Sequence, residues 1–347
     1  MKYGLFLYLP NHYALVTGLL PSHNGLTGNS FYDTGSGKNY RYSDRKKYLD
    51  KTWYGGTPIW VLAEQQKMLS ATYYWIGSDA GIKNVYPTYY YNYNEVTGIR
   101  ERISTVVNWL KLPAEDRPHF ITFYLPHADK NGHAFGPESI ETKQAVKLID
   151  LAVNELTGAV KTTGLDVNFI FVSDHGMIEA DYKNPIDIQA VVDTTNYKVY
   201  GDASMIQLYA KPGADMVPDY NKLKSNATGY NVYLKTNIPR HYHFNAKDDL
   251  YGRIGDILLM AKSPKMFKFG NYKVNPGQHG YEAEEVPEMR AVFYAWGPAF
   301  KKNTIIKPFK NVSIYNLVNK ILGLTFTEKV DGNDELAKKV LLINSLK

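Results

Sequence analysis

The strongest constraint on the fold is a strand, a helix and a second strand that follow one another in the middle of the chain. Residues 120–124 and 168–172 are short apolar runs typical of buried strands, and residues 139–161 between them repeat apolar side chains at helical spacing. A strand, a crossover helix and another strand produce a mainly parallel sheet. We therefore predict an α/β fold whose mainly parallel sheet is sandwiched by helices.

The rest of the sequence first extends this pattern and then departs from it. Helices are predicted over residues 10–18, 58–68, 98–110 and 313–322, a strand over residues 70–76, and a return to the core near residues 289–295. Residues 200–265 instead give short strands around a helix at 216–227, which indicates an inserted α+β unit. The predicted domains are a core of residues 1–199 and 266–347 and a small, cap-like α+β subdomain of residues 200–265.

Five side chains of the kinds that bind metals stand in three short motifs. Asp129 and His133 follow the first strand in a predicted glycine-containing loop, Asp174 and His175 follow the second strand, and His279 comes later. Open parallel sheets bind ligands at the carboxyl ends of their strands, and Asp with His suits zinc. A lone Asp and His at this spacing are more often hydrogen-bonding loop residues, but two adjacent candidates after a buried strand favour a metal site.

The composition narrows the class of partner. The 347 residues carry a net charge of +6 without an arginine-rich run or a basic helix, so a nucleic acid polymer is not a predicted partner, whereas an anionic small molecule is compatible. The absence of cysteine excludes disulfides and thiolate metal sites. Many of the 29 tyrosines stand in polar segments such as residues 86–93. There they either cover half-exposed sheet faces and loops or stack on a sugar or base.

The start of the chain gives no membrane or export signal. Residues 3–32 lack charged side chains, but Pro10, Pro21 and several glycines rule out a membrane-spanning helix. Residues 1–9 faintly resemble a signal peptide but lack an Ala-x-Ala cleavage site, so none is predicted. The cellular location is left open.

A longer set of motifs gives a specific resemblance. Residues 10–18 read Pro-Asn-His-Tyr-Ala-Leu-Val-Thr-Gly, a helix start whose free N–H groups suit a phosphate, and residues 29–33 read Asn-Ser-Phe-Tyr-Asp. Followed by the three ligand motifs in this order, they resemble the type I phosphodiesterase/nucleotide pyrophosphatase family of the alkaline phosphatase superfamily. The resemblance covers nearly the whole chain.

The resemblance implies a function and a role for each motif. It implies a metal-dependent hydrolase of phosphodiester or pyrophosphate bonds in nucleotides or related small molecules. Asp129, His133 and His279 would bind one zinc, and Asp174 and His175 would bind a second. Asn29 would hold a phosphate oxygen beside the nucleophile, and Tyr124 would stack on the nucleoside or other leaving group. A side-chain hydroxyl would be phosphorylated first and then released by water.

Two departures from the family bear on activity. The family's nucleophile, Thr or Ser, stands two residues before the Pro of Pro-Asn-His, where this chain has Tyr8. The family also begins with a strand that ends in Asp-Gly-x-Arg and supplies an Asp to the second zinc, and no such motif precedes residue 8. We therefore predict that the first zinc site is complete and that Asp174 and His175 bind zinc weakly or not at all.

These departures leave alternatives open. The chain is either a truncated product of a longer enzyme, which we favour, or a non-catalytic pseudoenzyme or binding module with a single zinc. A superfamily member acting on phosphate monoesters or phosphonates is a third alternative, against which Tyr124 and the order of motifs argue. If a central strand is missing, unpaired strand edges and exposed apolar surface are expected in the sheet.

Overall fold

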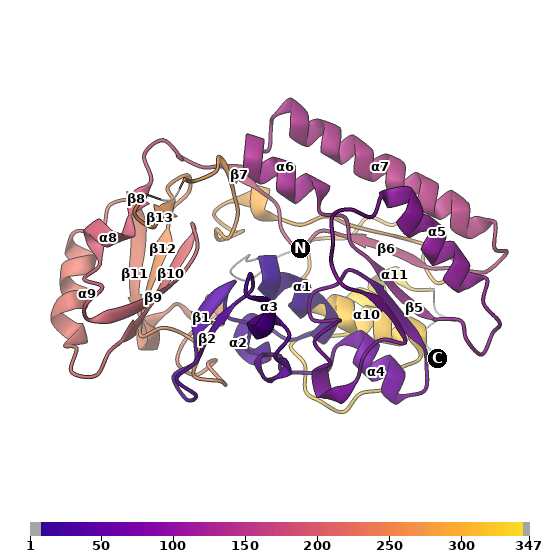
Figure 1. Cartoon of the computed structure of the whole chain (residues 1–347), viewed down its shortest axis with the longest axis horizontal. Helices are drawn as coiled ribbons and strands as arrows, with labels where there is room; N and C mark the ends of the chain where they lie inside the picture. Colours follow the sequence, from indigo (N-terminus) through magenta and orange to yellow (C-terminus); the bar gives the residue numbers. More distant parts are fainter. Residues whose placement is uncertain (1–7, 272, 343–347) are drawn as a thin grey trace.

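The computed structural model describes residues 8–271 and 273–342, which form mixed sheets with helices on both sides (Figure 1). In the core, β3 (Ser70–Tyr73) lies between β4 (Tyr89–Tyr91) and β5 (Phe120–Phe123), and all three strands are parallel. β6 (Phe169–Val172) instead pairs antiparallel with β15 (Phe293–Trp296). The prediction of an α/β fold is confirmed, but among the core strands only β3, β4 and β5 form a parallel sheet.

The direction of β15 has a physical reason. Between β6 and β15 the chain does not make a single crossover helix but runs through the whole inserted unit. A long excursion lets the returning strand enter the sheet from either end, whereas a short helical crossover forces it to be parallel.

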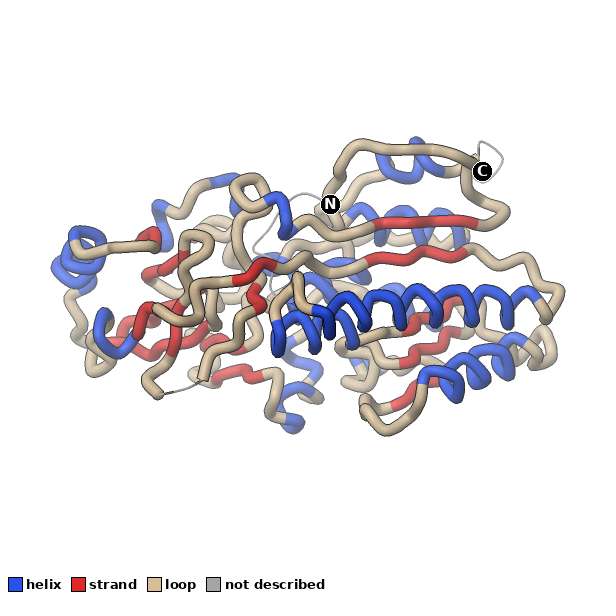
Figure 2. Tube along the Cα trace, turned by 90° about the horizontal axis from the view of Figure 1, so that it is seen from above, coloured by secondary structure: helices blue, strands red, loops and turns tan. Residues whose placement is uncertain are grey.

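Helices cover the two faces of the core strands. α5 (Ile99–Leu110) and α7 (Ile140–Lys161) pack on one face, and the long helix α7 runs alongside the strands in Figure 2. On the other face lie α1 (Tyr8–Thr17), α4 (Ile59–Gln65) and α10 (Ser313–Leu322). The predicted helices at 98–110, 139–161 and 313–322 are thus confirmed.

The strands β5 and β6 are less buried than β3. All four residues of β3 are buried, whereas Thr122 alone is buried among the residues of β5 and none is among those of β6. Within the described residues, β5 pairs only with β3 and β6 only with β15. Both strands are thus half-exposed, and the expectation of unpaired strand edges stays a prediction. The predicted cause concerns the segment before residue 8, which lies outside the described residues.

The inserted unit is an antiparallel sheet. Its order is β11 (Tyr230–Leu234), β12 (Ile257–Ala261), β10 (Met205–Ala210) and β9 (Tyr197–Gly201). α8 (Ile188–Val191) and α9 (Met216–Ser225) pack against it and share one apolar core with its strands. The sheet lies at the opposite side of Figure 1 from α5 and α7. The predicted strands and helix of this unit are present, and the domain boundaries stay a prediction.

Short elements connect these parts. The helices are α2 (Pro21–Asn24), α3 (Arg45–Tyr48), α6 (His127–Phe135) and α11 (Glu335–Val340). The strands form the antiparallel pair of β1 (Ser30–Tyr32) with β2 (Asn39–Arg41), the antiparallel pair of β7 (Ile178–Glu179) with β14 (Gly277–Gln278), and the parallel pair of β8 (Ile186–Asp187) with β13 (Phe267–Lys268). No helix among residues 8–271 and 273–342 has the length and apolarity needed to cross a bilayer.

His23 in α2 links the start of the chain to two distant segments. Its Nδ1 lies 2.9 Å from both carboxylate oxygens of Asp331, and its Nε2 lies 4.0 Å from Oδ1 of Asp248. The hydrogen bond to Asp331 raises the pKa of His23, although burial opposes it. The charged form of His23 therefore favours the folded state.

We expect His23→Gln to lower stability more at about pH 5.5 than at about pH 8.5. A histidine whose pKa is raised by folding contributes its full stability below its unfolded pKa of about 6.5. That contribution is lost as the pH rises through the folded value. A loss of about 1 kcal/mol is expected on the acidic side. Thermal unfolding of both proteins at the two pH values measures it, and equal losses at both would show that the charge contributes nothing.

Candidate metal and substrate site

Asp129 and His133 lie on a helix, not in the loop predicted from the sequence. α6 begins after Pro126, and the spacing of four residues puts both side chains on one face of the helix. Gly132 and the absence of an apolar stripe made the segment resemble a loop. Asp129 lies in the first turn, where the helix dipole favours a carboxylate, and His133 lies in the last turn.

His133 is fixed by the strand that precedes His279. Its Nδ1 donates a hydrogen bond to the carbonyl oxygen of Gly277 at 2.7 Å, which leaves Nε2 free to act as a metal ligand. A Cβ on Gly277 would lie 2.0 Å from the carbonyl oxygen of Gly132, so the backbones of α6 and β14 are in direct contact. His279, one residue after β14, is thereby brought to His133, with their Nε2 atoms 3.2 Å apart.

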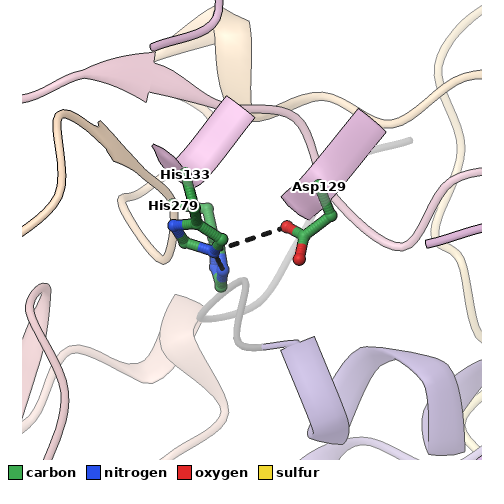
Figure 3. Close-up of side chains that lie close together, drawn as sticks. All are labelled: Asp129, His133 and His279. Carbon is green, nitrogen blue, oxygen red and sulfur yellow. Dashed lines mark hydrogen bonds and ion pairs between the residues drawn. The ribbon is translucent and has the colours of Figure 1, made fainter. Parts of the chain in front are cut away.

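Asp129, His133 and His279 form a group with the geometry of a metal site. Their ligand atoms all lie within 4.8 Å of one another, and the three side chains converge in Figure 3. Asp129 Oδ1 is 3.4 Å from His133 Nε2, yet it is buried and accepts no hydrogen bond within the described part of the chain. Burial raises the pKa of Asp129. Two imidazoles and a buried carboxylate oxygen without a hydrogen bond fit zinc.

Asp174 and His175, which follow β6, adjoin this group. The His175 ring stacks on that of His279 with centroids 3.7 Å apart, and its Nε2 lies 3.8 Å from Asp129 Oδ1. Asp174 Oδ2 lies 3.1 Å from His175 Nε2. All five residues singled out from the sequence therefore lie in one cluster, although they come from three distant segments.

The charges of this second pair depend on each other. Burial alone would raise the pKa of Asp174, but the nearby His12 and His175 hold it well below its usual range. Burial alone would lower the pKa of His175, but Asp174 raises it to about 9. Without a cation, these mutual shifts favour the carboxylate form of Asp174 and the imidazolium form of His175. A bound metal would replace the imidazolium proton.

His12 and Asn11 belong to the site and were missed from the sequence. His12 Nδ1 lies 3.1 Å from Asp174 Oδ2, and Asn11 Nδ2 donates to the carbonyl oxygen of Asp174 at 3.0 Å. The signal was present, because both residues belong to the Pro-Asn-His-Tyr motif, but that motif was interpreted as a helix start suited to a phosphate and as part of the family resemblance, with no role for these two side chains. The first turn of α1 is therefore anchored directly to the metal group.

An aromatic pocket opens beside the metal group. The cavity has a volume of about 370 Å³ and is lined by His12, Tyr42, Ser43, Arg45, Tyr48, Tyr74, Trp75, Ile76, Asp79, Tyr91, Asn92, Tyr93 and Tyr124. His12 connects the two regions, because it lines the pocket and also contacts Asp174. Among the lining residues, Arg45 Nη2 donates to Asp79 Oδ2 at 2.7 Å and to Asn92 Oδ1 at 3.1 Å, and its guanidinium carbon lies 5.1 Å from the Tyr48 ring centroid. The pocket thus combines stacking surfaces with a polar patch.

The other predicted residues are placed as follows. Tyr124 lines the pocket, and its ring lies edge-on to His12 with centroids 5.3 Å apart. Asn29 is half-buried, and its carbonyl oxygen accepts from the backbone of Tyr42 at 2.9 Å. Burial, and in addition the charge of Asp129, raise the pKa of Tyr42, so this loop lies within electrostatic reach of the metal group. Tyr8 opens α1, but its side chain lies outside the described residues, and its role stays a prediction.

Comparison with known sequences identifies relatives along most of the chain. Residues 8–282 match the type I phosphodiesterase / nucleotide pyrophosphatase family. Ectonucleotide pyrophosphatase/phosphodiesterase family member 1 of Mus musculus is 35% identical over 329 residues, which are 91% of this chain and 36% of that protein. An uncharacterised pyrophosphatase/phosphodiesterase of Schizosaccharomyces pombe is 33% identical over 335 residues, which are 91% of this chain and 68% of that protein.

Solved structures agree with the sequence comparison. Murine ectonucleotide pyrophosphatase/phosphodiesterase 5 superposes with a TM-score of 0.90 at 27% identity, covering 98% of this chain and 90% of that chain. An inactive variant of the same murine protein in complex with AMP superposes equally well. The chain spans only about a third of the mammalian family member 1, at 36% of its length. The resemblance seen in the sequence is confirmed: the chain belongs to the type I phosphodiesterase/nucleotide pyrophosphatase family, hydrolases of the alkaline phosphatase superfamily.

Proposed function

We propose that this chain is a zinc-dependent hydrolase of phosphodiester or pyrophosphate bonds in nucleotides or related small molecules. The observation that carries the proposal is the junction of the metal group and the aromatic pocket at His12. A substrate whose base lies in the pocket extends its phosphate toward the metal group along this side chain. The pocket and the metal group therefore do not need to move relative to each other for a bound phosphate to reach a bound metal.

Asp129, His133 and His279 would hold the zinc that binds most tightly. Zinc bound there would stabilise charge on the phosphate oxygens and lower the pKa of bound water. The residues themselves have separate tasks. Asp129 supplies the negative charge, while the Gly277 carbonyl holds His133 in the tautomer that leaves Nε2 free. The predicted second zinc at Asp174 and His175 requires the loss of the His175 proton and competes with His12 for Asp174.

The pocket suits the nucleoside part of a substrate. A cavity of about 370 Å³ is within the range of small-molecule sites. Tyr124 and Trp75 offer ring faces and edges for stacking, and Arg45 and Asp79 in the same lining would meet the polar groups of the ribose or base. We propose that Asn29, on the loop beside Tyr42, contacts the phosphate.

A second candidate function is zinc and nucleotide binding without hydrolysis. It is favoured by the position of Asp174 Oδ2, which lies 3.1 Å from the imidazole nitrogens of both His12 and His175, so that a second metal would have to compete with these contacts. It is also favoured by the Tyr at position 8, because a phenol oxygen lies several ångströms further from the backbone than a Thr oxygen. In this alternative the chain binds a single zinc and retains the pocket.

Two measurements separate these candidates. Calorimetric titration with AMP in the presence of zinc measures binding, and release of p-nitrophenol from p-nitrophenyl thymidine monophosphate measures hydrolysis. Hydrolysis that depends on added zinc would support the first candidate, and AMP binding without hydrolysis would support the second. A chain that binds neither zinc nor AMP would contradict both.

Replacing Tyr8 by Thr is expected to raise hydrolysis if the nucleophile is what limits this chain. The substitution places a short hydroxyl at the position where the family has its nucleophile. The p-nitrophenol assay with added zinc measures the gain against the wild-type chain, with Tyr8→Phe as the control that removes the hydroxyl without shortening the side chain. If the Thr variant is also inactive, the incomplete second metal site would be the cause of the missing hydrolysis.

A further inference from the structure

Arg102 is a buried cation directly behind the wall of the substrate pocket. Its side chain leaves the first turns of α5 and is only 3% exposed. Its Nη1 donates to the carbonyl oxygen of Tyr124 at 2.7 Å, which is the short distance typical of a charge-assisted hydrogen bond. Its guanidinium carbon lies 4.9 Å from the ring centroid of Phe123 and 5.6 Å from that of Tyr74.

This environment is unusual for an arginine. Within the described residues, Arg102 makes no ion pair with a carboxylate, and its Nε is buried without a hydrogen-bond partner. Burial lowers the pKa of Arg102. Contacts with aromatic ring faces and with one backbone oxygen are what mainly offset the burial of the Arg102 charge. Burying a charge without an opposite charge costs free energy of desolvation. We therefore expect the Arg102 charge to act on the group that it contacts most strongly, which is Tyr124.

The carbonyl of Tyr124 marks the point where the chain leaves the sheet. The backbone N–H of Tyr124 still bonds to the carbonyl oxygen of Tyr73 at 3.1 Å, so the residue continues the pairing of β5 with β3. The chain then turns through Pro126 into α6. The carbonyl that Arg102 holds thus belongs to the residue whose ring meets the pocket, where that ring lies edge-on to His12 and 6.3 Å from the Tyr93 centroid.

We propose that Arg102 is a positioning residue for the bound nucleotide. By holding the Tyr124 carbonyl, it sets the angle at which the Tyr124 ring faces the pocket. This inference rests on the proposed nucleotide site. The metal group does not depend on Arg102 in the same way, because the far end of α6 is anchored separately through His133 and Gly277. The Tyr124 ring and the metal ligand His133 are thus positioned by two different contacts.

The test compares AMP and zinc binding in three variants. Arg102→Met keeps an unbranched apolar stem but removes the guanidinium and its donors, and Arg102→Lys keeps one charged donor. Arg100→Met is the matched control, because Arg100 lies on the same helix, is exposed and pairs with Glu155. We expect Arg102→Met to weaken AMP binding about tenfold or more, the loss typical of a hydrogen bond to a charged group. Zinc affinity is expected to change by less than about threefold, Arg102→Lys to recover part of the AMP affinity, and the control to match wild type.

The outcomes distinguish positioning from general support of the fold. Parallel losses of AMP and zinc affinity in the Arg102 variants, or AMP binding equal to wild type, would overturn the inference. If the wild-type chain binds no AMP, a crystal structure of the Arg102→Met protein decides the inference by itself. A Tyr124 ring in its original orientation would then overturn it, and a displaced ring would support it.

Discussion

Replacing His279 by Ala is expected to remove tight zinc binding from this chain. His279 and His133 bring their Nε2 atoms to 3.2 Å, and with Asp129 they are the group whose ligand atoms converge within 4.8 Å. Loss of a residue that only hydrogen-bonds a ligand weakens metal sites by about 10–100-fold, so loss of a ligand itself should cost more than about 100-fold. Titration with zinc under competition from a chelator of known affinity measures the change.

Thermal unfolding gives an independent measure of the same site. A metal that binds only the folded chain stabilises it by about 2.7 kcal/mol at a hundred times its dissociation constant. We expect added zinc to raise the unfolding temperature of the wild-type chain and not that of His279→Ala. His241→Ala is the control, because His241 is exposed in the inserted unit. If His279→Ala keeps the zinc response and its stoichiometry, zinc binds elsewhere.

The same comparison tests the second site. Asp174 and His175 adjoin the first group, so two zinc ions per wild-type chain would contradict the prediction that this pair binds weakly or not at all. One zinc per wild-type chain and none in His279→Ala would agree with it. Anomalous scattering at the zinc edge locates each ion directly.

The sequence was most informative where a local pattern determines the structure. The helix α7 was predicted with its bounds because its apolar residues recur at helical spacing over 22 residues and Ser139 caps its start. The two ligand motifs at the ends of β5 and β6 were recognised because short apolar runs typical of strands precede them, although these strands are only half-buried in the structure. These features depend on neighbours along the chain.

The missed features depend on contacts between distant segments. The direction of β15 cannot be inferred from its own residues, because it depends on the path of the inserted unit. Arg45 and Asp79 of the pocket belong to no motif and meet only in the folded chain. The helix α6 was missed because it contains Gly132 and mostly polar residues and so lacks an apolar helical pattern. The four-residue spacing of Asp129 and His133 nevertheless indicated a helix.

Replacing Arg253 by Met is expected to give the largest loss of stability of any substitution considered. Arg253 Nε donates to Asp33 Oδ2 at 2.9 Å, and both side chains are nearly buried, at 6% and 11% exposed. The other guanidinium nitrogens donate to the carbonyl oxygens of Gly25, Trp53 and Thr52 at 2.8–3.2 Å. These contacts fix the inserted unit, which carries Arg253, to the first part of the core.

The size of the loss follows from what the substitution leaves behind. Asp33 would keep a buried charge without its partner, and three carbonyl oxygens would lose their donors, which together cost about 3–5 kcal/mol. Burial alone would raise the pKa of Asp33, but hydrogen bonds from Ser36 and Arg253 lower it. The ion pair therefore contributes stability above the unfolded pKa of Asp33, and this contribution is lost as the pH falls through the folded value.

Urea unfolding of four proteins separates the charge from the packing. They are the wild type, Arg253→Met, Asp33→Asn and the double variant, with Arg100→Met as an exposed control that should leave the midpoint unchanged. If the unpaired Asp33 charge causes most of the loss, adding Asp33→Asn to Arg253→Met should restore part of the stability, so that the double variant costs less than the two single losses together. Strictly additive losses would show that Arg253 acts through its carbonyl contacts and its packing on the Trp53 ring, 4.9 Å from the guanidinium carbon, and not through Asp33.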